Sequence, residues 1–246
     1  MTETVFTAPL IHWAWPWVGT GFAIVLIGFL FFSNQLRSDK SISRWKDMVW
    51  LSWLGVLGYL LHNIEEYGID LQGTIFAFPK IFSQLMGAAD GSNPAPWGFF
   101  TVTNITLVWI VLPVSAWLSR KYPAILSCIV SALFVNAFIH IMGTRAMGGY
   151  NSGLFTGLIF FLPFSLWVYG YALKHKSTWF GWGCIGWSLV VGVLTQIAIL
   201  RGSINAYFAG ILSPTAFVII QAVNTALLLY LSYIVGRKYS KISNEI

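Results

Sequence analysis

Residues 48–67, with the sequence MVWLSWLGVLGYLLHNIEEY, decide how this chain of 246 residues folds. A run of about 20 mainly apolar residues is long enough to cross a bilayer as one helix. This run, however, ends in the motif His62-x-x-Glu65-Glu66. An acidic residue near the centre of a membrane helix costs about 2.5–3.5 kcal/mol, and such residues are usually functional. We therefore expect the acidic pair and its histidine to mark a functional site.

The composition is that of a polytopic integral membrane protein. Hydrophobic residues make up 57% of the chain and charged residues 9%, whereas soluble domains carry roughly 25% charged residues. The net charge of +6 is scattered over short loops and forms no patch for nucleic acid. The N-terminus lacks the basic start and the small-residue cleavage site of a signal peptide. We expect a single all-α domain in a bacterial inner membrane, in contact with lipid and not with nucleic acid.

Seven runs are long enough to span the bilayer. They lie near residues 17–36, 48–67, 97–119, 122–143, 153–173, 178–200 and 213–236. With seven spans, eleven of the fourteen lysines and arginines fall on one side of the membrane and three on the other. Because cytoplasmic loops carry the excess of positive charge, the N-terminus is predicted outside and the C-terminus in the cytoplasm.

Polar residues of the second and fourth spans are predicted to meet. At a rise of 1.5 Å per residue, His62 and Asn136 each lie roughly 21 Å above the start of their span, and Glu66 and His140 roughly 27 Å. Asn136 and His140, four residues apart, share one face of their helix. The sequence therefore gathers histidine, carboxylate and amide groups in the outer half of one bundle, where Glu65 joins them.

Three short motifs resemble the HXXEE-domain membrane proteins. The matching segments are His62-Asn63-Ile64-Glu65-Glu66, Asn136-Ala137-Phe138-Ile139-His140 and Tyr150-Asn151-Ser152-Gly153. The family is recognised by His-x-x-Glu-Glu, Asn-x-x-x-His and Tyr-x-Pro-Gly, so Ser152 stands where the family has proline. The resemblance covers about residues 62–153. It implies the positions of a site and a polytopic topology, but no reaction.

The residues of these motifs suggest a metal site. His62, Glu65, Glu66 and His140 supply imidazole and carboxylate ligands that suit zinc, or iron or manganese. The predicted catalytic residues are Glu65, Glu66, Asn136, Arg145 and Tyr150. Arg145 either holds a lipid phosphate or satisfies carbonyl groups at the end of its helix.

The sequence favours an enzyme that acts on a lipophilic small molecule, by metal-assisted hydrolysis or related chemistry. Three alternatives stay open: a metal-free lipid isomerase that uses acid–base catalysis, a small-molecule transporter, and a buried polar contact that only holds the second span against the fourth. A retinal protein is excluded because the seventh span contains no lysine. The roles of His12 and Arg201, the substrate and the oligomeric state are not predicted. The segment 68–96 contains an apolar stripe at helical spacing, which indicates an interfacial helix that either lies over the site or only anchors the chain at the membrane surface.

Overall fold

The computed structural model describes residues 9–86, 95–175 and 178–243, and these residues form seven helical rods. Several rods contain a π-helical turn, denoted η2 to η5. The rods are α2 (Leu10–Phe32); α3 (Met48–Asn63) with η2 (Ile64–Gly68); α5 (Trp97–Asn104) with η3 (Ile105–Val111) and α6 (Leu112–Leu118); α7 (Ile125–Met147); α8 (Leu154–Thr156) with η4 (Gly157–Phe161) and α9 (Leu162–His175); α10 (Thr178–Val193) with η5 (Leu194–Ile199) and α11 (Leu200–Phe208); and α12 (Pro214–Ser243).

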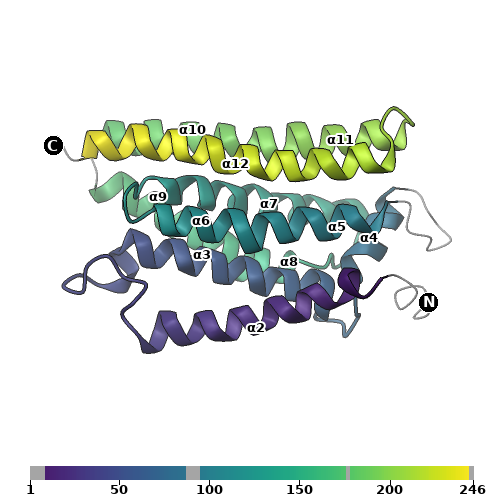
Figure 1. Cartoon of the computed structure of the whole chain (residues 1–246), viewed down its shortest axis with the longest axis horizontal. Coiled ribbons are helices and arrows are strands. Elements are labelled where there is room, and N and C mark those ends of the chain that lie inside the picture. Colours follow the sequence, from purple (N-terminus) through teal and green to yellow (C-terminus); the bar gives the residue numbers. More distant parts are fainter. Residues whose placement is uncertain (1–8, 87–94, 176–177, 244–246) are drawn as a thin grey trace.

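The rods run along one long axis (Figure 1). Helix α2 lies at one side of the bundle, and α10 and α12 lie at the opposite side. Helix α2 begins at the end of the bundle where α11 and α5 meet the short helix α4 (Ala77–Leu85), and α12 ends at the other end. Six rods are long and apolar enough to cross a membrane, which confirms an all-α membrane-helical protein.

The rod Met48–Gly68 is not among those six, although the sequence predicts it as the second span. Its last two turns carry His62, Asn63 and both glutamates, and these polar residues lower its mean hydropathy. Most of its residues are nevertheless buried by neighbouring helices. The seventh crossing, and the orientation that depends on it, therefore remain predictions.

Several helix boundaries differ from the sequence prediction, and α12, for example, ends at Ser243 rather than near residue 236. Helix α2 begins at Leu10 rather than Trp17, and Pro16 lies inside it. Pro16 is the seventh residue of the helix, so it lies beyond the first turn and removes the N–H that would otherwise bond to the carbonyl oxygen of His12. The sixth rod continues beyond residue 200 to Phe208, through a stretch that is less apolar. The start of α3 agrees with the prediction, because the Asp47 side chain accepts hydrogen bonds from the N–H groups of Val49 and Trp50.

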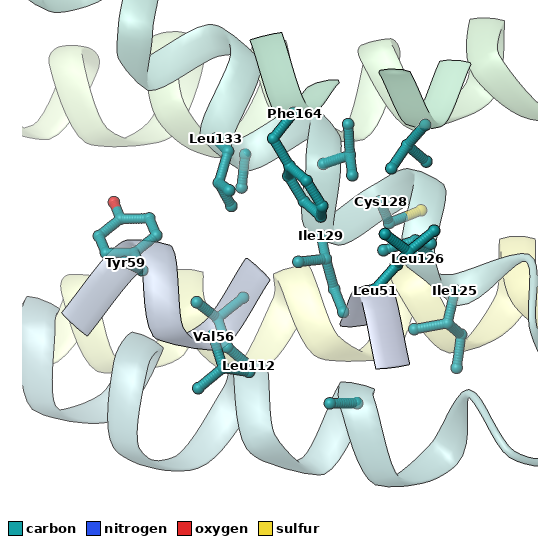
Figure 2. Close-up of a cluster of buried hydrophobic side chains, with 14 of the residues drawn as sticks. Leu51, Val56, Tyr59, Leu112, Ile125, Leu126, Cys128, Ile129, Leu133 and Phe164 are labelled. Atoms are coloured by element: carbon teal, nitrogen blue, oxygen red, sulfur yellow. The ribbon is translucent and has the colours of Figure 1, made fainter. Parts of the chain in front are cut away.

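The main hydrophobic core lies between α3, α6, α7 and α9. In Figure 2, Ile125 lies at one end of this cluster and Tyr59 at the other. The next turn of α3 after Tyr59 carries His62, so the apolar core ends where the polar motif begins. This arrangement places the polar residues inside the bundle near the end at which α2 begins.

The short helix α4 covers that end of the bundle, as the apolar stripe predicted. Ile81 and Phe82 are buried, whereas Leu85 is exposed. Phe76, which precedes α4, is buried and adopts a φ of 54°, an uncommon conformation for a bulky side chain. The rest of the predicted covering segment, residues 87–94, lies outside the described residues.

Candidate metal centre

Three buried side chains, from α3, η2 and α7, converge on one point. Nε2 of His140 lies 3.3 Å from Oε1 of Glu66, and Nε2 of His62 lies 3.5 Å from Oε2 of the same carboxylate. One ligand atom from each of these residues lies within 4.8 Å of the others. The exposed fractions are 0% for His62, 4% for Glu66 and 1% for His140. The predicted meeting of the second and fourth spans is therefore confirmed.

The polar atoms of this triad are incompletely satisfied by the protein. Nε2 of His62 and Nδ1 of His140 are buried without a hydrogen-bond partner among the described residues. Within the same part of the chain, no lysine or arginine forms an ion pair with Glu66. Buried polar groups nearly always have partners, so such unpaired atoms require an explanation. A bound cation between the carboxylate and the two imidazoles would supply one.

Glu65, which the sequence places among both the metal ligands and the catalytic residues, points to a different partner. Its Oε1 accepts hydrogen bonds from the Tyr150 hydroxyl at 2.6 Å and from the N–H of Phe155 at 3.0 Å. Its Oε2 accepts from the N–H and the hydroxyl of Thr156, at 2.8 and 2.6 Å. A carboxylate has about four lone-pair sites, and all four are occupied here. Glu65 is thus the anion at the N-terminus of the rod that starts with α8.

The turn before α8 holds the two glutamates and the histidines in place. Ser152, which stands where the family motif has proline, donates a hydrogen bond of 2.6 Å to the carbonyl oxygen of Glu65. Gly153 has a φ of 93°, and a Cβ atom there would lie 2.7 Å from Cε1 of His62. Only glycine combines this backbone conformation with so close an approach.

Aromatic rings surround the triad. The His62 ring lies 4.6 Å from Phe161 and 4.8 Å from His140, measured between centroids. Phe78 of α4 lies 6.0 Å from the His140 ring. The site is therefore a polar point enclosed by apolar walls, in which electrostatic interactions are strong.

The other predicted catalytic residues occupy three different positions. Asn136 donates a hydrogen bond of 3.4 Å to the Tyr59 hydroxyl, next to the triad. Tyr150 contacts Glu65, as described, and burial together with that carboxylate raises the pKa of its hydroxyl above the ordinary value. Arg145 is exposed in the last turn of α7 and forms no ion pair with the described residues.

The remaining polar residues of this end lie apart from the triad. Nδ1 of His12 lies 2.7 Å from the hydroxyl of Thr101, and the imidazole stacks on Trp97. Arg201 is exposed on α11. Neither residue belongs to the group that could hold a metal ion.

Thr156 is a site residue that the sequence did not indicate. Its hydroxyl lies 2.7 Å from Nδ1 of His62 and 2.6 Å from Oε2 of Glu65, so it connects the two motif residues. It follows the third motif by three residues, but a threonine in the first turn of a helix is common. Only the conformation of the turn directs its hydroxyl into the bundle.

Comparison with known proteins agrees with this location of the site. The family model described as "Protein of unknown function with HXXEE motif" matches residues 53–168. That segment contains the triad and all residues that contact it through hydrogen bonds. No curated protein and no solved structure matches the chain.

Proposed function

We propose that this chain, whose residues 53–168 match the HXXEE family model, is a membrane-embedded, metal-dependent hydrolase that acts on a lipophilic substrate. His62, Glu66 and His140 bind the metal ion in this proposal. The observation that carries it is the convergence of their three ligand atoms within 4.8 Å at a fully buried point.

The ligand types support a catalytic rather than a structural ion. Structural zinc sites are usually closed by four protein ligands, whereas catalytic sites use three and leave a position for water or substrate. Two histidines and one glutamate form a ligand set used by catalytic zinc. Two histidines and one carboxylate also hold iron in oxygenases. Zinc suits hydrolysis, because it polarises a carbonyl group and lowers the pKa of bound water to about 7.

The surroundings of the triad support a lipophilic substrate. The triad lies inside a bundle of membrane-type helices, and the rings of Phe161 and Phe78 lie beside its histidines. A water-soluble molecule would lose its hydration on entering such a site, whereas an apolar molecule would not. The unpaired amide oxygen of Asn136 lies close to the triad and is available to a polar group of the substrate.

Elemental analysis of the purified full-length chain tests the metal. Wild-type protein should contain about one zinc, iron or manganese ion per chain, as a three-ligand catalytic site holds one ion. The variants His62→Ala, Glu66→Gln and His140→Ala should lose it. His12→Ala is the matched control, since it removes an imidazole at the same end of the bundle without touching the triad, and it should keep the ion.

Hydrolysis is tested on the same proteins with a p-nitrophenyl ester of a long-chain fatty acid in mixed micelles. Turnover by the wild type and the His12→Ala protein, with loss in the three triad variants, is the expected result. Turnover of a lipid by protein that contains no metal would instead favour the metal-free acid–base enzyme. Protein that moves a solute across proteoliposomes without converting it would favour the transporter.

A further inference from the structure

The hydroxyl of Thr156 has one hydrogen atom to donate and lies within short hydrogen-bond distance of two side-chain atoms. It lies 2.6 Å from Oε2 of Glu65, a carboxylate oxygen that can only accept, and 2.7 Å from Nδ1 of His62. A third contact, to the carbonyl oxygen of Gly153, is 3.4 Å long. The short, charge-assisted bond takes the hydroxyl hydrogen to Glu65. The oxygen of Thr156 is then an acceptor toward His62, so Nδ1 of His62 carries its hydrogen.

The direction of the hydrogen bond between His62 and Thr156 determines the protonation state of the second ring nitrogen of His62, Nε2. A neutral imidazole has one N–H and one lone pair. With hydrogen on Nδ1, the lone pair of His62 is on Nε2, the atom that faces Glu66 at 3.5 Å and has no hydrogen-bond partner. An imidazole lone pair and a carboxylate oxygen that face each other in a buried site repel unless a proton or a metal cation lies between them. The hydrogen-bond chain therefore prepares His62 as a ligand.

We propose that the two adjacent glutamates have separate roles: Glu66 binds the ion, whereas Glu65 acts through Thr156 to set the tautomer and orientation of His62. Glu65 is thus a positioning residue and neither a ligand nor a base. The proposal rests on the metal function above, and it assigns Thr156 a role in metal affinity. Partners of ligating histidines typically change metal affinity by 10–100-fold when they are replaced.

Five variants of the full-length chain separate these roles in titrations with Zn²⁺ against a competing metal indicator, and with Co²⁺ followed by its visible absorption. Glu66→Gln should abolish binding. Glu65→Gln and Thr156→Val should each keep one site per chain but weaken it about 10–100-fold, with altered Co²⁺ bands. The double variant Glu65→Gln/Thr156→Val should bind no more weakly than either single variant, since the two residues act in series. Thr156→Ser, which keeps the hydroxyl, should bind like the wild type.

Thr195→Val is the matched control, because Thr195 is a buried threonine whose hydroxyl bonds only to carbonyl groups of its own helix. It should leave metal affinity unchanged. The proposal is overturned if Thr156→Val binds as tightly as the wild type, or if Thr156→Ser is as weak as Thr156→Val. Loss of stoichiometric binding in Glu65→Gln would also overturn it, by making Glu65 a ligand.

Nitrogen-15 NMR of histidine-labelled protein tests the relay without any metal. The His62 signals, identified by their absence in His62→Ala, should show hydrogen on Nδ1 in the wild type and in Thr156→Ser. They should show hydrogen on Nε2, or a mixture of tautomers, in Thr156→Val. An Nε2–H tautomer in the wild type would refute the relay. Protein that binds no ion but shows the Nδ1–H tautomer would refute the metal function alone.

Discussion

Gly153 lies so close to His140 that a Cβ atom on the glycine would be 2.4 Å from Cε1 of the imidazole. The same Cβ would be 2.7 Å from Cε1 of His62, on the other side of the triad. The backbone of the turn therefore forms part of the wall that holds both rings. The two imidazole rings occupy the volume that a side chain at position 153 would fill, so the site requires glycine there.

Gly153→Ala should displace one or both imidazoles and abolish metal binding, because the three atoms nearest to the new methyl, all within 3 Å, belong to the imidazole rings. Metal content of the purified variant checks this. Gly148→Ala is the control, since Gly148 also has a positive φ, of 68°, but has nothing within 4 Å of the added Cβ. Both variants carry a backbone cost of about 1–2 kcal/mol, so only the difference between them reports the collision. Normal metal content in Gly153→Ala would contradict the described packing.

Tyr150→Phe removes one of the four hydrogen bonds to Glu65 while keeping the ring. Hydrogen bonds to charged groups contribute about 1.5–3 kcal/mol, so the free energy of unfolding in detergent should fall by that amount. Denaturant titration of the wild type and the variant checks it. An unchanged free energy of unfolding would show that the hydroxyl of Tyr150 does not hold Glu65 in solution.

The same pair predicts a pH dependence. The pKa of Tyr150 is raised in the folded protein, by burial first and by Glu65 second. A raised pKa means that the stabilisation is complete below the unfolded pKa of about 10 and is lost as the pH rises through the folded value. The melting-temperature advantage of the wild type over Tyr150→Phe should therefore be constant up to about pH 10 and shrink above it. A constant advantage across the whole alkaline range would exclude this titration.

Asp47→Ala should destabilise the protein without affecting the site. Its buried carboxylate accepts hydrogen bonds from the N–H groups of Ser38, Asp39, Val49 and Trp50. Loss of a helix cap costs about 0.5–2 kcal/mol. Metal content should stay normal, since Asp47 precedes the first turn of α3 and the triad lies at the last turns of that rod. If Asp47→Ala lost metal as well as stability, the cap at the start of α3 would affect the geometry of the triad at the end of that rod.

A reporter fused to the C-terminus tests the orientation and, with it, the seventh crossing. Eleven of fourteen lysines and arginines fall on one side only if Met48–Gly68 spans the membrane. Green fluorescent protein at the C-terminus should fluoresce, and alkaline phosphatase there should be inactive. The opposite result would place the triad near the cytoplasmic leaflet.

Hydropathy and helical rise were enough to predict the helical bundle and the contact between His62, Glu66 and His140, because both depend on spacing along straight helices. The division of labour between the two glutamates was not predictable. Glu65 and Glu66 are neighbours in sequence, and the π-helical turn Ile64–Gly68 together with the turn 148–153 decides which faces the histidines. Of the partners of Glu65, Tyr150 lies in the third motif, whereas no pattern in the sequence connects Thr156 to Glu65.

The complete burial of His62, Glu66 and His140 has a consequence for how an ion would come and go. Because these side chains have almost no exposed surface among the described residues, release would require the surrounding structure to open, and its rate would report that opening rather than the strength of the ligand bonds. Stripping by EDTA would then reach a limiting rate that higher EDTA concentrations cannot increase.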